Sequence, residues 1–194
     1  MSQDAEWVER ILEGDEDAFE RLYQKYRRSL YRTALAITSD PGAAEEILQD
    51  GFLRAYPHLH RVDCTKPLGP WLQRIVVNLS YNWANQRKRW HLPLDEVMDR
   101  LVAGPWGSPH GSYEREETRE VLRRAIESLS LEKRTVLVLF YLQGFSHAEI
   151  AYIMRCPLGT VKSRLHHARK ALRHALVQEG SLEVRGAAAD LGSS

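Results

Sequence analysis

Residues 144–173 read GFSHAEIAYIMRCPLGTVKSRLHHARKALR, and two helix starts follow one another closely within them. Ser146 and Glu149 have the spacing of a capping box, in which each side chain bonds a backbone N–H at the start of a helix. Pro157 is favoured in the first turn of a helix, because its missing N–H would have no partner there. The sequence therefore predicts two helices joined by a tight turn, which is the arrangement of a helix-turn-helix. Their predicted ranges are about 146–154 and 157–176.

The second of these helices has one apolar face and one basic face. Val161, Leu165, Ala168 and Leu172 recur at helical spacing, so they share the side that is expected to face inward. In a helix-turn-helix the second helix enters the major groove, where a few side chains read bases and basic side chains hold phosphates. An ordinary helical hairpin with a solvated basic face is the alternative. The residues predicted to contact duplex DNA are Thr160, Lys162, Ser163, Arg164, His166, His167, Arg169 and Lys170.

The distribution of charge points to a second surface of the same kind. The chain has 27 basic and 26 acidic residues, but Asp and Glu are absent from residues 64–94 and from residues 150–178. Two acid-free basic segments in a nearly neutral chain predict two local surfaces for a polyanion such as nucleic acid. The alternative for either segment is a helix face that meets only water.

Periodic apolar residues predict helices in the rest of the chain as well. Asp40 and Pro41 should begin one of them, with the aspartate as cap and the proline in the first turn. The run Val136–Tyr141 could form a strand by itself, but helical signals on both sides favour a buried helix. The predicted helices are 15–37, 41–56, about 71–89, 113–129 and 130–144, with a loop at 58–70.

The predicted fold class is all-α, with two small helical domains joined by a flexible linker. The boundary falls at residues 103–112, AGPWGSPHGS, because glycine, proline and serine at this density interrupt helices. We expect a first domain at 1–95, a linker at 96–112, a second domain at 113–178 and a disordered tail at 179–194.

Several of these segments resemble the bacterial sigma-70 family, in the variant of its extracytoplasmic-function (ECF) group. Residues 156–173 resemble the promoter-recognition helix of that group, and residues 145–151 resemble the helix before it. Residues 44–56 are similar to the helix that docks on core RNA polymerase. Residues 71–79 are similar to the start of the helix that binds the −10 promoter element, and residues 14–19 to the family's opening. The segments occur in the expected order over most of the chain, which makes the resemblance specific.

The resemblance implies a sigma factor, which binds core RNA polymerase and promoter DNA and directs transcription initiation. It implies that the second domain binds the −35 duplex and that the first captures the melted −10 strand. Residues 62–69 would form a loop that shapes the pocket for an unpaired base. An anti-sigma factor is the further partner that the family implies. The implied −10 contacts are Lys66, Arg74, Asn78, Tyr81, Asn82, Asn85, Arg87, Lys88 and Arg89, and the implied core polymerase contacts are Gln49, Asp50, Leu53 and Arg54.

Two other functions fit parts of the pattern. A conventional helix-turn-helix regulator would bind duplex DNA without polymerase, but it leaves the N-terminal resemblance unexplained. A nucleic-acid enzyme such as a recombinase would need clustered acids or a nucleophile beside a basic surface. Ser80, Tyr81 and Ser163 are the candidate nucleophiles, but both basic segments lack acids. We therefore expect no catalytic residues and no cofactor.

Metal, disulfide and membrane sites are not expected either. His58, His60 and Cys64 form a cluster without a fourth ligand in a zinc-binding pattern. Cys64 and Cys156 lie far apart in the sequence, which fits a cytoplasmic protein better than a disulfide framework. Every apolar run is shorter than the ~18 residues that a membrane span needs. The acidic, polar N-terminus is unlike a secretory signal.

Overall fold

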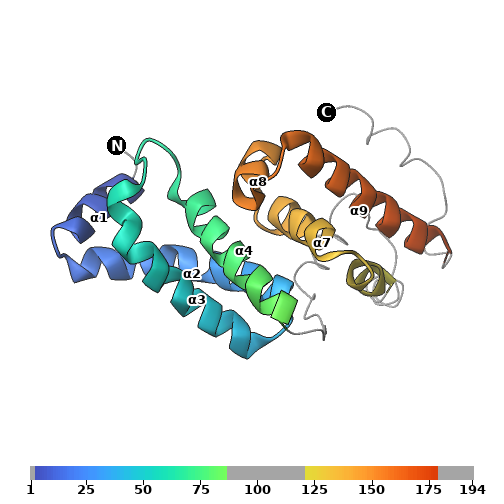
Figure 1. The fold of residues 1–194 in the computed structure, drawn as a ribbon, viewed down its shortest axis with the longest axis horizontal. Helices are drawn as coiled ribbons and strands as arrows, with labels where there is room; N and C mark the ends of the chain where they lie inside the picture. The colour runs from blue at the N-terminus through green and yellow to red at the C-terminus, as the bar shows by residue number, and fades with distance from the viewer. Residues whose placement is uncertain (1–2, 87–120, 179–194) are drawn as a thin grey trace, which may run out of the picture. The chain divides into compact units, whose positions relative to one another are not determined.

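The structure, a computed structural model, describes residues 3–86 and 121–178. Every regular element in these two ranges is a helix, which confirms the predicted all-α fold (Figure 1). By their contacts, residues 3–86 and 145–161 form one compact unit, and residues 121–144 and 162–178 form another. The predicted linker and tail lie outside the described residues, and the predicted domain boundaries stay predictions.

The first unit has a bundle of helices as its framework. Its described elements are α1 (Gln3–Leu12), α2 (Glu16–Thr38), α3 (Pro41–Ala55), the 3-10 helix η1 (Tyr56–Arg61), α4 (Leu68–Gln86) and α8 (His147–Met154). Helices α2, α3 and α4 pack against one another (Figure 1). Leu22 and Leu30 of α2, Phe52 of α3 and Leu72 of α4 are almost completely buried in their shared core. Burial of side chains of this size stabilises a fold by about 1.5–3 kcal/mol each.

The predicted start of α3 is confirmed. Asp40 accepts a backbone hydrogen bond at 3.0 Å, and Pro41 occupies the first turn. Helix α2 ends immediately before it, because Ser39 adopts a left-handed backbone with a φ of 58°. Further along α3, a Cβ on Gly51 would lie 3.0 Å from the Cγ2 atom of Val76 on α4. The missing side chain at Gly51 therefore lets α3 and α4 approach each other closely.

Helix α1 was not predicted from the sequence. Its side chains Trp7, Val8 and Ile11 are 9%, 2% and 4% exposed and belong to the core of the first unit. Only this short stripe carries the helical signal, in a segment that otherwise looks polar. Burial against α2 thus stabilises a helix that a periodicity argument over longer windows misses.

The predicted loop at 58–70 was too long at both ends. Residues Tyr56–Arg61 form η1, in which Pro57 occupies the first turn, and α4 begins at Leu68 rather than near Trp71. Leu68 is 2% exposed, so core packing anchors the first turn of α4. Pro70 fits in that first turn without destabilising the helix, because the N–H that a proline lacks would have no partner there.

The second unit confirms the helix predicted at 130–144. Its described elements are the helical residues 121–127, α7 (Leu131–Leu137), the π-helix η2 (Val138–Leu142) and residues 162–178 of α9 (Leu158–Gln178). The run Val136–Tyr141 is helical, although the π-helical turn itself was not predicted. Arg134 is 4% exposed, and its Nη2 donates to the carbonyls of Glu127 and Leu129 at 2.9 and 3.2 Å. Burial lowers the pKa of this guanidinium.

Truncation of a buried side chain of α1 tests its place in the core. Ile11→Ala should lower the free energy of unfolding by about 2–5 kcal/mol, because it removes buried methylenes and leaves a cavity. Leu12→Ala is the matched control, since the neighbouring Leu12 is 54% exposed, and it should change stability by less than about 0.5 kcal/mol. Urea unfolding followed by tryptophan fluorescence measures both variants. Equal effects of the two substitutions would contradict the packing of α1.

Candidate nucleic-acid interfaces

Local backbone geometry builds the turn between α8 and α9. The Glu149 N–H donates to Ser146 Oγ at 3.3 Å, and the Ser146 N–H donates to Glu149 Oε2 at 2.8 Å, so both halves of the capping box are present. Arg155 adopts a left-handed φ of 50° that ends α8. The Cys156 N–H then bonds the carbonyl of Ala151 at 3.1 Å. The predicted succession of helix, tight turn and helix is confirmed.

Burial along α9 follows the predicted apolar stripe. Val161, Leu165, Ala168 and Leu172 are at most 1% exposed. The residues predicted to contact DNA lie on the remaining surface of the helix. Those exposed are Lys162, Ser163, His166, His167 and Lys170, and those half-buried are Thr160, Arg164 and Arg169. Helix α9 therefore presents a face without acids, although each individual DNA contact stays a prediction.

Arg169 differs from its neighbours on this face, because other side chains of the second unit hold its guanidinium. Its Nε donates to the Tyr141 hydroxyl at 2.9 Å. The guanidinium carbon also lies 5.2 Å from the ring centroid of Phe140 and 5.6 Å from that of Tyr141. Cation–π contacts of this kind contribute about 0.5–2 kcal/mol. Arg169 thus fastens α9 to η2, a role that sequence reasoning missed.

The residues of α4 that are predicted to contact the −10 strand lie along one side of the helix. Asn78, Asn82 and Asn85 are exposed, while Arg74 and Tyr81 are half-buried. The Arg74 guanidinium lies over the ring of Tyr152 on α8 at 4.8 Å. The remaining predicted −10 contacts at residues 87–89 lie outside the described residues. Within the described part, the structure places three amide side chains in a row on one face.

The loop before α4 is organised by its own side chains. Asp63 accepts a hydrogen bond from the Thr65 N–H at 3.1 Å and from its hydroxyl at 2.5 Å. Lys66 lies 3.0 Å from the other carboxylate oxygen of Asp63. The bond from the Thr65 side chain, followed by that from Lys66, lowers the pKa of Asp63 to about 2. The predicted contact residue Lys66 is therefore held in a turn, with 77% of its side chain exposed.

The predicted polymerase-binding residues lie on the exposed side of α3. Gln49, Asp50, Leu53 and Arg54 are all exposed, and Leu53 is 72% exposed although it is apolar. The opposite side of α3 packs into the core through side chains such as Phe52. An exposed leucine between polar groups is typical of a protein interface with a polar rim.

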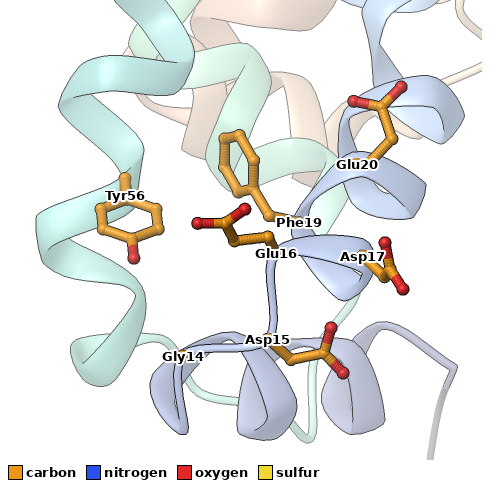
Figure 2. Close-up of a pocket in the computed structure, with 7 residues that line it drawn as sticks. All are labelled: Gly14, Asp15, Glu16, Asp17, Phe19, Glu20 and Tyr56. Carbon is orange, nitrogen blue, oxygen red and sulfur yellow. The ribbon is translucent and has the colours of Figure 1, made fainter.

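A pocket of about 500 Å³ lies beside the start of α2, with Tyr56 of η1 across from it (Figure 2). The rings of Phe19 and Tyr56 contact each other edge to face, with their centroids 5.4 Å apart. Glu16 and Glu20 also line the pocket. Acidic groups around aromatic rings suit a basic side chain and repel phosphate. This pocket was not predicted, because its members come from two separate elements.

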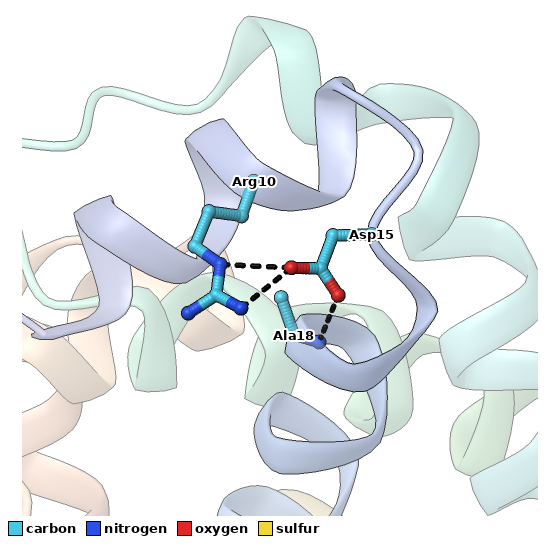
Figure 3. A network of polar contacts seen from close by, with 3 residues as sticks. All are labelled: Arg10, Asp15 and Ala18. Atoms are coloured by element: carbon cyan, nitrogen blue, oxygen red, sulfur yellow. Dashed lines mark hydrogen bonds and ion pairs between the residues drawn. The ribbon is translucent and has the colours of Figure 1, made fainter.

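Asp15 fixes the chain beside this pocket. Its Oδ1 accepts a hydrogen bond from the Ala18 N–H at 3.1 Å, so it caps α2. Its Oδ2 accepts bonds from Nε and Nη2 of Arg10 on α1, at 2.8 and 2.6 Å (Figure 3). The bond from Arg10, and next that from the Ala18 backbone, lowers the pKa of Asp15. The Asp15 carboxylate therefore accepts a hydrogen bond from the first turn of α2 and also holds the turn between α1 and α2.

Metal-binding clusters and membrane-spanning helices are absent from the described residues. Among them, no group of three or more potential ligand side chains is placed to hold a metal ion. No helix in the described ranges is long and apolar enough to cross a membrane. Neither Cys64 nor Cys156 takes part in a disulfide.

Comparisons with known proteins match both halves of the chain. Residues 22–90 match the family model of sigma-70 region 2, and residues 119–172 match that of sigma-70 region 4. The ECF RNA polymerase sigma factor SigW of Bacillus subtilis is 30% identical over 87% of this chain and 94% of its own length. The ECF RNA polymerase sigma-E factor of Escherichia coli K12 is 32% identical over 85% of this chain and 90% of its own.

Solved structures share the fold. The sigma factor RpoE of Bartonella quintana, in complex with the anti-sigma factor NepR, is 25% identical with a TM-score of 0.60. The match covers 82% of this chain and 96% of that one. CnrH, in complex with the cytosolic domain of CnrY, has a TM-score of 0.66 at 21% identity and covers 92% of this chain and 99% of that one. At that identity, the second match supports the fold alone.

Substitutions at two neighbouring basic residues of α9 separate folding from surface charge. Arg169→Ala should lower the free energy of unfolding by about 1–3 kcal/mol, because it removes a hydrogen bond to a charged group and two ring contacts. Lys170→Ala, at the exposed next position, should change it by less than about 0.5 kcal/mol. Thermal and urea unfolding of both variants measure the difference. Two equal values would show that Tyr141 and Phe140 do not hold Arg169 in solution.

Proposed function

This chain is an RNA polymerase sigma factor of the extracytoplasmic-function group of the sigma-70 family, and we propose that three helices divide its work. Helix α9 binds the −35 duplex, α4 captures the melted −10 strand, and α3 docks on core RNA polymerase. One observation carries this division: the two acid-free segments supply polar faces on two different helices, α4 and α9. A conventional regulator is not favoured, because it would not account for the match of residues 22–90 to region 2.

The proposed role of α9 rests on its fixed start and its two faces. The capped α8 and the turn at Arg155 set where α9 begins. The first turns of α9 then expose Lys162 and Ser163, while Val161 and Leu165 are buried. The N-terminal part of a recognition helix is the part that meets base edges. Later residues such as Lys170 are placed to hold phosphates, which fix the position of the protein on DNA.

The proposed role of α4 rests on side-chain chemistry. Asn78, Asn82 and Asn85 each carry both donors and an acceptor, so they can pair with the edges of unpaired bases. Tyr81 is half-buried, and a ring that stacks on a base contributes about 1–3 kcal/mol. The loop at residues 62–67, organised by Asp63, would form one wall of the pocket for an extruded base. Arg87, Lys88 and Arg89 are proposed to hold the strand's phosphates.

The proposed role of α3 rests on its exposed apolar residue. Leu53 lies among Gln49, Asp50 and Arg54, so a partner could bury the leucine and pair with the polar groups around it. The nearby pocket at Phe19 adds an acidic and aromatic surface suited to basic side chains. These features favour a protein partner over nucleic acid on this side of the bundle.

Partners and location complete the proposal. RpoE of Bartonella quintana was solved in complex with an anti-sigma factor, and we extend that class of partner to this chain. We also propose that the protein acts in the cytoplasm, where RNA polymerase works, and that it has no catalytic activity of its own.

Run-off transcription tests the proposal as a whole. The purified chain is mixed with core RNA polymerase and a library of promoters that vary at the −35 and −10 elements. Initiation at a defined subset of promoters, absent with core polymerase alone, is the expected result. If the mixture initiates at no promoter, or at all of them equally, the proposed function is wrong.

Charge reversal on α9 tests the −35 surface. Lys162→Glu should weaken binding to −35 duplex DNA and lower the slope of log affinity against log salt by about 1 or more, because a phosphate contact is lost. Lys133→Glu on α7 makes the same change of net charge away from α9 and should leave the slope nearly unchanged. Fluorescence anisotropy with labelled duplex over a salt series measures both. Equal loss in the two variants would point to general charge instead of α9.

Truncation on α3 tests the polymerase surface. Leu53→Ala should weaken binding to core RNA polymerase about tenfold, since an exposed apolar residue buried at an interface typically contributes 1–2 kcal/mol or somewhat more. Its stability should change by less than about 0.5 kcal/mol. Leu12→Ala, which removes another exposed leucine from α1, serves as the control and should keep full affinity. Titration of labelled protein with core polymerase gives both constants, and unchanged affinity of Leu53→Ala would remove this surface.

A further inference from the structure

The start of α4 packs against a side chain of another helix. Helix α4 begins at Leu68, so Gly69 lies in its first turn. This start follows directly after the loop that is proposed to shape the −10 pocket. A contact that fixes Gly69 therefore also helps to fix the position of the loop before it.

Tyr26 of α2 is the group that meets Gly69. The Tyr26 ring packs against the backbone of Gly69. The ring is so close that a Cβ on Gly69 would lie 3.3 Å from Tyr26 Cε1 and 4.0 Å from the hydroxyl oxygen. The absence of a side chain at residue 69 thus allows the backbone to reach the tyrosine.

Asp4 of α1 completes the chain of contacts. The Tyr26 hydroxyl donates to Asp4 Oδ2 at 2.6 Å, and Lys25 Nζ donates to Oδ1 at 2.6 Å. Asp4 is only 8% exposed. Burial, and next the bond to Asp4, raises the pKa of Tyr26, so the phenol stays protonated and continues to donate.

We propose that Asp4 and Tyr26 are positioning residues for −10 recognition. Through Gly69 they fix the first turn of α4, and with it the loop of residues 62–67 that leads into the helix. This inference rests on the proposed −10 role of that loop. The Arg10–Asp15 pair joins the same two helices but does not reach α4, so the assignment is specific to the contacts of Tyr26.

The test measures discrimination rather than total activity. Tyr26→Phe keeps the ring and removes the hydroxyl. Run-off transcription with the variant holoenzyme compares promoters that differ by one base in the −10 element, and others that differ by one base in the −35 element. Discrimination among −10 bases should fall about three- to tenfold, as expected for one lost hydrogen bond, while −35 discrimination and core affinity stay unchanged. A loss of folded protein would lower all outputs together and leave these ratios unaltered.

Two further variants are measured beside Tyr26→Phe. Tyr23→Phe removes a hydroxyl one turn earlier on α2, from a ring that packs 4.8 Å from Phe52, and should leave −10 discrimination unchanged. Gly69→Ala places a methyl against the Tyr26 ring and should reduce −10 discrimination as Tyr26→Phe does. If Tyr26→Phe does not fold, Asp4→Asn replaces it, with the same expected direction.

The outcomes separate the two proposals. If the wild-type chain initiates at no promoter, the proposed function fails and the positioning role fails with it. If the wild-type chain discriminates among −10 bases and the folded variants discriminate equally well, only the positioning role of Asp4 and Tyr26 is overturned.

Discussion

The backbone N–H and C=O groups at helix ends need hydrogen-bond partners, and this need organises the structure. The first N–H groups and the last carbonyls of a helix have no partner inside it, and leaving them buried and unpaired is costly. Side chains meet this demand at the points where loops turn into helices. Asp15 caps α2, Asp40 caps α3 and Ser146 caps α8, while Arg134 bonds carbonyls between the helical residues 121–127 and α7. Because a cap also fixes the residues before it, the bonds that stabilise these helices also place the connecting segments. At the start of α4 the stabilising contact comes from a different helix, because the Tyr26 ring lies against Gly69.

The two acid-free segments differ in ways that suit closed and opened DNA. Lys162 and Lys170 on α9 are flexible point charges, and phosphates line a duplex whatever its sequence. Asn78 and Asn82 on α4 are uncharged amides, which gain most from base edges that become available only when pairs are broken. The absence of acids protects both faces from repulsion by the DNA backbone. The type of side chain, rather than the amount of charge, is therefore what supports the proposal that one face binds the duplex and the other the single strand.

The features that sequence alone predicts are those settled by neighbouring residues. The capping box at Ser146, the cap at Asp40 and the apolar stripe of α9 depend on residues within a few positions of each other, and all three are confirmed. Helix α1 and the early start of α4 depend on burial against distant elements, so their short local patterns are too weak to predict them. Arg169 illustrates the same limit within the site: its place on the basic face is predictable, but its bond to Tyr141 is not. The acidic pocket at Phe19 and the contacts of Tyr26 likewise arise only when separate helices meet.

The close approach of α3 and α4 has a mechanical consequence for promoter opening. Gly51 lets the two helices come so near that a single added methyl would lie 3.0 Å from Val76. Well-packed interiors resist small displacements, since each contact is already near its optimal distance. The proposed polymerase-binding side of α3 and the proposed strand-binding side of α4 thus belong to one rigid bundle. Docking through Leu53, as proposed, would hold the face of Asn78 in place directly, and no conformational freedom between these two surfaces would have to be lost when a melted strand binds.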